Sequence, residues 1–281
     1  MDFTLESGGG VALSGEETGA DGPAIVLLHG LTAARRYVVH GSNHLPRNGY
    51  RLVAYDCRGH GRSEAAPEGA YGYVNLADDA AAVIGARAGD ARPILAGHSM
   101  GAHTIAALAL RDPGRFAAAV LIGPAVVGEP APAESLAYWD RLAEGLERGG
   151  AEGFLEAYDD GLDEDWRETL LRITRQRLSQ HEHPEGVAGA LREVPRSLPF
   201  EGLGALRDLD LPALVVASHD EADPGHPYQV AQAWAEALPR ARLVSEEPGS
   251  SPLAWQGGRL SRVIQEFCAS PEVRERLDAA G

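Results

Sequence analysis

The chain of 281 residues contains no lysine, so all 25 of its basic side chains are arginines. A Schiff base with a carbonyl substrate or with pyridoxal phosphate requires a lysine amine, and so does the phosphate-binding Walker loop. The sequence therefore excludes these three kinds of chemistry.

Cysteine and long apolar runs are also scarce. The two cysteines, Cys57 and Cys268, show no metal-ligand spacing, and we expect reduced thiols and no metal or other cofactor. No apolar run approaches the roughly 18 residues of a membrane-spanning helix. Residues 1–6 lack the basic region and apolar core of a signal peptide. We therefore expect a cytoplasmic protein.

Positive charge is outnumbered, because 41 acidic residues face the 25 arginines and give a formal net charge of −16. Such a chain disfavours nucleic acid and anionic membranes as partners. The expected partner is a small-molecule substrate, and the oligomeric state stays open.

Short apolar runs alternate with helical patterns along most of the chain. A hairpin is predicted over 3–14, strands near 24–28, 51–55, 93–96, 118–122, 212–217 and 241–245, and helices near 36–47, 74–88, 101–111, 228–238 and 258–268. This alternation predicts an α/β fold with a doubly wound, mostly parallel sheet.

Residues 124–200 interrupt that alternation. Helical patterns over 133–148, 151–159, 163–180 and 184–194 follow one another there, separated by proline and glycine, and no strand-like run occurs. We expect a helical cap over 124–200, inserted after the strand near 118–122. The core would then comprise 1–123 and 201–281.

The pentapeptide at 97–101 reads Gly-His-Ser-Met-Gly. It lies between a short apolar strand and a helical pattern, which is the context that a Gly-x-Ser-x-Gly nucleophile elbow requires. The alternative, an incidental serine in a glycine-rich loop, lacks an explanation for this strand-turn-helix setting. Ser99 is therefore the candidate nucleophile, at a helix N-terminus that favours developing negative charge.

Two further segments accompany this motif in a fixed order. His29-Gly30-Leu31-Thr32 follows the strand at 24–28, and Asp56-Cys57-Arg58-Gly59-His60-Gly61-Arg62-Ser63 follows the strand at 51–55. With the elbow, these segments resemble the α/β-hydrolase fold family, strongly over about 3–125 and moderately over 205–268. The resemblance implies an oxyanion hole formed by the backbone N–H groups of Met100 and Leu31.

The resemblance also places a carboxylate after the strand at 212–217. Aligning on Asp-Pro-x-x-Pro selects Asp223, while aligning on the strand end selects Asp220 or Glu221. We favour Asp223, with Asp220 second. Only one of the three can orient an imidazole, and the others would then simply cap the helix near Pro227.

The family's histidine follows the strand at 241–245, but Ser250 occupies that position here. A serine hydroxyl has no pKa suited to accept a proton near neutrality. Four interpretations stay open. Another histidine reaches Ser99; the reaction needs only an oxyanion hole and one acid or base; the protein binds without catalysis; or Ser250 is an introduced substitution.

His226 is the best candidate for a displaced base, because it lies three residues after Asp223 on the loop that leaves a strand's carboxyl end. His181 and His183, in the expected cap, come next. His29 is interpreted as a loop-packing residue.

Aromatic side chains suggest an apolar pocket. Tyr138 and Trp139 lie in the expected cap, and Trp255 lies just beyond the Ser250 position. A partly aromatic roof favours a small apolar acyl or lactone substrate. We therefore expect a serine hydrolase that acts on a small ester, lactone or related carbonyl compound. The alternative on the same fold is a non-hydrolytic lyase, cyclase or small-molecule binding protein.

Overall fold

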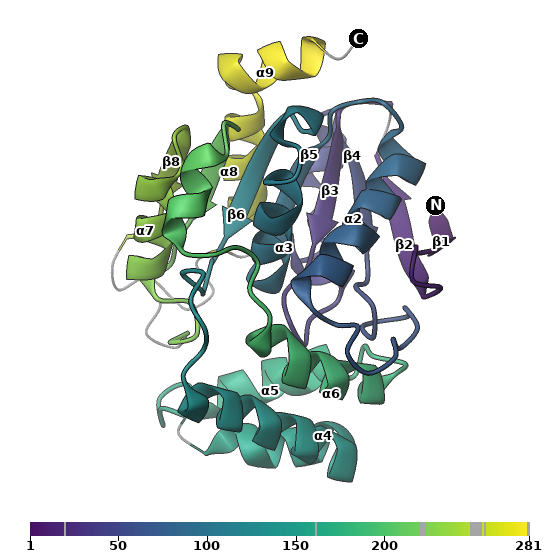
Figure 1. Ribbon diagram of the computed structural model, residues 1–281, viewed down its shortest axis with the longest axis vertical. Coiled ribbons are helices and arrows are strands. Elements are labelled where there is room, and N and C mark those ends of the chain that lie inside the picture. The colour runs from purple at the N-terminus through teal and green to yellow at the C-terminus, as the bar shows by residue number, and fades with distance from the viewer. Residues whose placement is uncertain (20, 161, 220–222, 248–254, 256, 280–281) are drawn as a thin grey trace.

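The structure is a computed structural model that describes residues 1–19, 21–160, 162–219, 223–247, 255 and 257–279. Within this part of the chain, the sheet has eight strands in the order β1-β2-β4-β3-β5-β6-β7-β8 (Figure 1). They are β1 Asp2–Glu6, β2 Ala12–Thr18, β3 Ala24–Leu28, β4 Arg51–Tyr55, β5 Ile94–His98, β6 Ala118–Ile122, β7 Ala213–Val216 and β8 Ala241–Val244.

Along this order the strands from β4 to β8 pair in parallel, and β2 pairs antiparallel with both β1 and β4. The central strands read as continuous apolar runs because both of their faces are covered. In β3 and β6 every residue is buried. The doubly wound, mostly parallel sheet expected from the sequence is confirmed.

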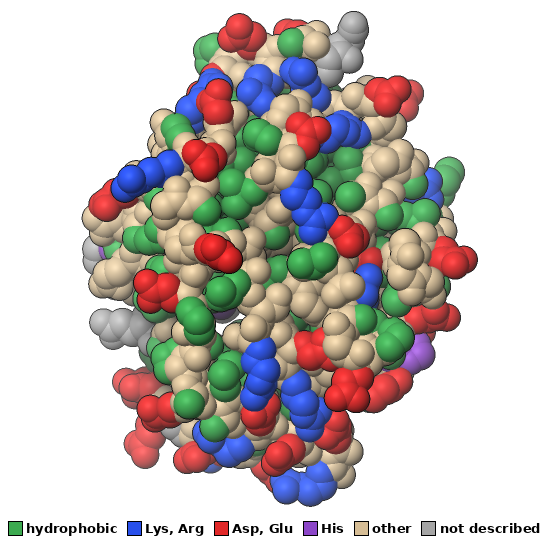
Figure 2. Space-filling view, in the orientation of Figure 1, with side chains coloured by type: hydrophobic (Ala, Val, Ile, Leu, Met, Phe, Trp, Pro, Cys, Tyr) green, Lys and Arg blue, Asp and Glu red, His purple; other side chains and the backbone are tan. Residues whose placement is uncertain are grey.

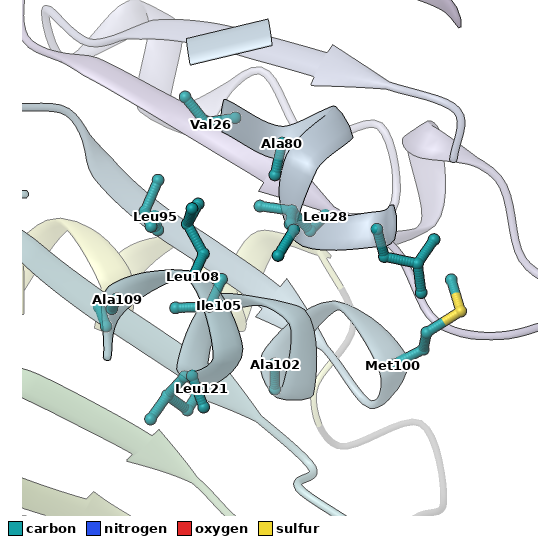
Figure 3. Close-up of a cluster of buried hydrophobic side chains, with 14 of the residues drawn as sticks. Val26, Leu28, Ala80, Leu95, Met100, Ala102, Ile105, Leu108, Ala109 and Leu121 are labelled. Atoms are coloured by element: carbon teal, nitrogen blue, oxygen red, sulfur yellow. The ribbon is translucent and has the colours of Figure 1, made fainter. Parts of the chain in front are cut away.

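Helices cover both faces of the sheet. One face packs against α2 (Tyr73–Ala88), α3 (Met100–Ala109) and α7 (Tyr228–Ala237), and the other against α1 (His44–Arg47) and α8 (Gly257–Cys268). Figure 3 shows α3 against the sheet, where Ile105 meets Leu95 and Leu121. Besides the three helices described next, the remaining elements are α9 Pro271–Asp278 and the 3₁₀ turns Arg35–Tyr37, Pro113–Arg115, Val194–Arg196 and Leu203–Asp208.

Three helices between β6 and β7 form a layer below the sheet in Figure 1: α4 (Ala133–Asp159), α5 (Arg167–Leu178) and α6 (Pro184–Glu193). They share an apolar cluster, and Leu31, just after β3, packs against it. The helical layer therefore lies over the carboxyl ends of the parallel strands, where ligand sites of such sheets gather.

One helix prediction needs correction. The predicted helix over 36–47 is wrong: a 3₁₀ turn at Arg35–Tyr37 and the short α1 stand there, because His40 and Gly41 take left-handed φ values of 49° and 70° that interrupt helical geometry. The two helices predicted over 133–159 are close to the structure, where α4 is broken at Gly149 and Gly150.

The described helices include none that is long and apolar enough to cross a membrane.

Candidate active site

Ser99 lies at the sharp turn between β5 and α3. Its φ of 51° and ψ of −115° place a residue with a Cβ in a region that favours glycine, so the backbone there is strained. The flanking glycines permit this turn. A Cβ on Gly97 would lie 2.5 Å from the Gly101 carbonyl, and one on Gly101 would lie 2.1 Å from the Leu28 oxygen.

The Ser99 hydroxyl is open to an incoming group. The Ser99 N–H donates to the Ile122 carbonyl at 2.9 Å, which fixes the turn to the end of β6. Within the described part of the chain, Oγ has no hydrogen-bond partner and is not among the buried polar atoms. The side chain is thus held by its backbone alone.

The loop after β3 lies directly against Ser99. A Cβ on Gly30 would lie 2.8 Å from the His98 Nδ1 and 3.3 Å from the Ser99 Cβ, so a glycine is needed for the loop to approach this closely. The N–H groups of Leu31 and Met100 donate to no other group of the described residues. Met100 is also the first residue of α3, where backbone amides favour negative charge. The structure therefore brings the three sequence-predicted groups to one place.

Histidines support this loop from behind. His29 accepts from the Cys57 N–H at 2.9 Å through Nε2, and its Nδ1 lies 2.8 Å from the Gly30 oxygen. His181 accepts from the Gly61 N–H at 2.8 Å and donates through Nε2 to the Thr32 oxygen at 3.0 Å. Burial lowers the pKa of both rings, that of His181 to about 4. Both nitrogens of each ring are engaged, so neither ring is free to serve Ser99.

Asp56 holds the second loop of the motif. Its carboxylate accepts from the Arg35 N–H at 2.8 Å, from the Arg35 guanidinium at 2.7 Å and from the Arg62 N–H at 3.1 Å. These bonds join the turn after β4 to the segment that follows the Leu31 loop. Asp56 therefore acts on the geometry of the site rather than on a substrate.

Asp223 and His226 face each other on the loop after β7. The His226 Nδ1 lies 2.8 and 2.9 Å from the two Asp223 oxygens. Burial alone would raise the pKa of Asp223, but the charge of His226 and the hydrogen bond from its ring lower it below its ordinary value. Asp223 is therefore ionised at neutral pH, and its oxygens accept the hydrogen bond that the Nδ1–H group of His226 donates. Nε2 has no hydrogen-bond partner among the described residues.

The same ring lies beside the elbow. The His226 and His98 ring centroids are 4.9 Å apart, and His98 directly precedes Ser99. A Cβ on Gly123 would lie 3.4 Å from the His226 Cδ2, and Gly123 follows the Ile122 whose carbonyl holds the Ser99 N–H. His183, in contrast, is a surface residue 3.3 Å from Glu185. Asp220, Glu221 and Ser250 lie outside the described residues.

The aromatic candidates have defined partners. Tyr138 and Trp139 lie on α4 with ring centroids 5.7 Å apart and pack against the apolar cluster of the helical layer. Burial raises the pKa of Tyr138 to about 12. Trp255 donates through Nε1 to the Ala217 oxygen at 2.7 Å and so closes over the end of β7.

Two groups escaped the sequence analysis. Glu246, 2% exposed, accepts from the Ser218 hydroxyl at 2.5 Å and from the His219 N–H at 2.7 Å, and so anchors the start of the loop that carries Asp223. Arg177, on α5, has a buried Nε with no hydrogen-bond partner among the described residues. No motif marks either residue, because each role depends on neighbours distant in sequence.

Among the described residues, no group of three or more histidine, cysteine, aspartate or glutamate side chains is arranged to hold a metal ion.

A family model described as alpha/beta hydrolase fold matches residues 23–256. The chain belongs to the alpha/beta hydrolase fold family. The structure is similar to that of a thermophilic esterase from Thermogutta terrifontis, with a TM-score of 0.79, 24% identity and 99% of each chain covered. It is also similar to the enol-lactonase from Burkholderia xenovorans, with a TM-score of 0.74, 23% identity, 95% of this chain and 100% of that one covered. At such identities the likeness shows the fold.

Curated relatives match over parts of their length. A protein of Variovorax paradoxus that carries the name carbamate hydrolase RutD is 37% identical over 103 residues, which cover 37% of this chain and 38% of that protein. A protein of Mycobacterium phage D29 that carries the name non-heme haloperoxidase is 30% identical over 189 residues, 66% of this chain and 62% of that protein. The chain thus spans about two fifths of the length of the first relative and about three fifths of the length of the second.

Proposed function

We propose that this alpha/beta hydrolase is a serine hydrolase that cleaves small esters or lactones, with Ser99 as nucleophile and His226 as general base. The observation that carries the proposal is the Asp223–His226 pair, whose Nδ1 to oxygen distance of 2.8 Å leaves Nε2 available beside the elbow. The names of the esterase and enol-lactonase with similar structures support this substrate class.

Each group has one task in this mechanism. Ser99 Oγ attacks the carbonyl carbon while His226 Nε2 takes its proton. The N–H groups of Leu31 and Met100 stabilise the negative oxygen that forms. The same imidazolium then protonates the departing alkoxide, and water, activated by His226, hydrolyses the acyl-serine. Ionised Asp223 keeps the ring in the required tautomer and stabilises its charged form.

The proposal explains how the family's usual histidine position can hold Ser250. The base stands on the loop after β7 together with its acid, three residues apart, instead of on the loop after β8. We propose in addition that α4–α6 cap the site, because Leu31 packs against their apolar cluster.

Steady-state hydrolysis of p-nitrophenyl butyrate tests the assignment. His226→Gln should lower kcat about 10²- to 10⁴-fold with a much smaller change in KM, since the lost proton transfer acts in the transition state. Ser99→Ala should abolish turnover and labelling by a fluorophosphonate. The control is His219→Gln on the same loop, whose ring stacks on Tyr228 with centroids 4.0 Å apart and which should keep kcat.

A second experiment adds Ser250→His to the His226→Gln variant and asks whether activity returns. If the pocket performs acyl transfer, a histidine at the family's usual position should restore part of kcat. Activity that survives His226→Gln would place the base elsewhere. An inactive native chain, unlabelled at Ser99, would favour the non-hydrolytic lyase, cyclase or binding protein.

A further inference from the structure

Arg177 lies on the inner face of α5. Thr174 and Leu178 are buried, and His181, just beyond the helix, is bonded to the Thr32 oxygen and the Gly61 N–H. Positions 174, 177, 178 and 181 share one helix face because they are three, four and seven residues apart. The bonds of His181 fix that face over the loop that carries Leu31.

The Arg177 guanidinium forms no hydrogen bond or ion pair with any described residue. Its Nε is buried without a hydrogen bond, and Nη1 and Nη2 are accessible and equally unbonded within the described part of the chain. Most of the other arginines of the helical layer are paired with carboxylates, and Figure 2 shows blue and red side chains intermixed over it. Its surface ion pairs are Arg148–Glu156, Arg167–Asp159, Arg175–Glu152, Arg192–Glu147 and Arg196–Asp140.

A second orphan group stands near it. The Tyr37 hydroxyl, six residues after Leu31, is buried and lacks a hydrogen-bond partner among the described residues. Burial lowers the pKa of Arg177, and the neighbouring Tyr158, Asp223 and Tyr37 act on it in the opposite direction. Arg177 in turn helps to lower the pKa of His98, beside Ser99. Both oxygens of Asp223 lie against His226, and no described carboxylate forms an ion pair with Arg177.

A guanidinium whose Nε is buried without a hydrogen bond is costly, and a buried hydroxyl without a partner adds to that cost. A carboxylate satisfies both, because the guanidinium fork matches its two oxygens and a phenol donates a further hydrogen bond. The chain as a whole has a net charge of −16 and repels anions in general, so a site suited to a carboxylate needs a local positive group such as Arg177.

We propose that Arg177 and Tyr37 bind a carboxylate of the substrate, so that the site selects esters or lactones that carry an anionic group away from the scissile bond. This inference rests on the proposed hydrolase function and narrows its substrate class. It makes Arg177 a specificity-determining residue rather than a catalytic one.

The test compares two esters that differ at one end, mono-p-nitrophenyl adipate and its neutral counterpart p-nitrophenyl hexanoate. The native chain should have the higher kcat/KM on the adipate ester. Arg177→Gln should lower that value about 10- to 100-fold, the range expected when a hydrogen-bonded charge pair is lost, and change the value on the hexanoate ester by less than about threefold. A series of esters from succinate to suberate locates the best spacing.

Two variants serve as comparisons. Arg175 lies two residues before Arg177 on the same helix and forms a surface ion pair with Glu152. Arg175→Gln removes only that pair, so the preference for the anionic ester should persist. Tyr37→Phe removes only the hydroxyl and should reduce the preference less than Arg177→Gln. Circular dichroism of each variant verifies folding.

The outcomes separate the two proposals. Hydrolysis of the hexanoate ester that depends on Ser99, with no preference for any dicarboxylate ester or with a preference that survives Arg177→Gln, would overturn the anionic subsite alone. If neither ester is hydrolysed, the serine hydrolase proposal fails. The subsite is then decided by calorimetry with free adipate, which should bind the native chain and Ser99→Ala and bind Arg177→Gln at least about tenfold more weakly.

Discussion

At the scale of single residues, one buried ion pair supports the loop after β4. Arg58 donates to both oxygens of Asp79 at 2.6 and 2.7 Å, and the two side chains are 2% and 1% exposed. Asp79→Asn leaves a buried guanidinium without its counter-charge, which typically costs about 3–5 kcal/mol in the free energy of unfolding. Urea denaturation followed by circular dichroism measures this loss.

The adjacent Asp78 is a matched control. It pairs with Arg111 on the surface of α2, where its side chain is 56% exposed. Water and salt screen such a pair, so Asp78→Asn should change the free energy of unfolding by about 1 kcal/mol or less. Equal losses for the two variants would contradict the role assigned to burial.

Some features of these residues can be predicted from the sequence, and others cannot. The sharp turn at Ser99 could be predicted because it depends on a local strand-to-helix connection, and the contact between Asp223 and His226 because they share one short loop. The contacts of His181 with Gly61 and Thr32 join positions 120 and 149 residues apart. Arg177 carries no signal at all, since a missing partner is a property of three-dimensional packing.

At the scale of elements, α4 depends on a close backbone contact between its two halves. The helix breaks at Gly149 and Gly150, and the chain folds back so that Gly145 meets Gly153. A Cβ on Gly145 would lie 2.4 Å from the Gly153 oxygen. Gly145→Ala should force the halves apart and destabilise the helical layer by about 1–3 kcal/mol, the usual range for overpacking.

Gly85→Ala provides the comparison for this variant. Gly85 is an exposed residue of α2 with nothing within 4 Å of an added Cβ, so alanine should stabilise the protein by about 0.5–1 kcal/mol. Thermal unfolding of both variants checks the opposite signs. If Gly145→Ala also stabilised the protein, the close contact inside α4 would not be required.

Element prediction worked where composition and geometry agree. The strands were recognisable because buried parallel strands are continuous apolar runs with turn motifs at their ends. Residues 36–47 have a helical apolar spacing, but the left-handed backbone at His40 and Gly41 depends on how the loop packs over the sheet and leaves no such pattern in the sequence.

At the scale of the whole molecule, buried neutral histidines link stability to pH. Burial lowers the pKa of His98 and His103 to about 3 and that of His181 to about 4, and it also lowers the pKa of His29 and His60. In the unfolded chain each ring has a pKa near 6.5. Between these values the unfolded state binds more protons than the folded state.

The free energy of unfolding should therefore rise with pH across this window and fall as pH drops from about 6.5 toward 4. Each such histidine contributes a slope of up to about 1.4 kcal/mol per pH unit. Urea titrations between pH 7 and 5 measure this slope, because this window lies above the range in which most carboxylates titrate.

His103 offers the sharpest test, because it is 3% exposed and its Nε2 accepts from the Ala125 N–H at 2.9 Å, which leaves Nδ1 as the protonated nitrogen facing Tyr73. His103→Gln cannot take up a proton, so its slope should be smaller than that of the native chain by about the contribution of one histidine. A native stability that does not change from pH 7 to 5 would mean that these rings accept protons in the folded state, and the loops around Ser99 would then have to tolerate their charge.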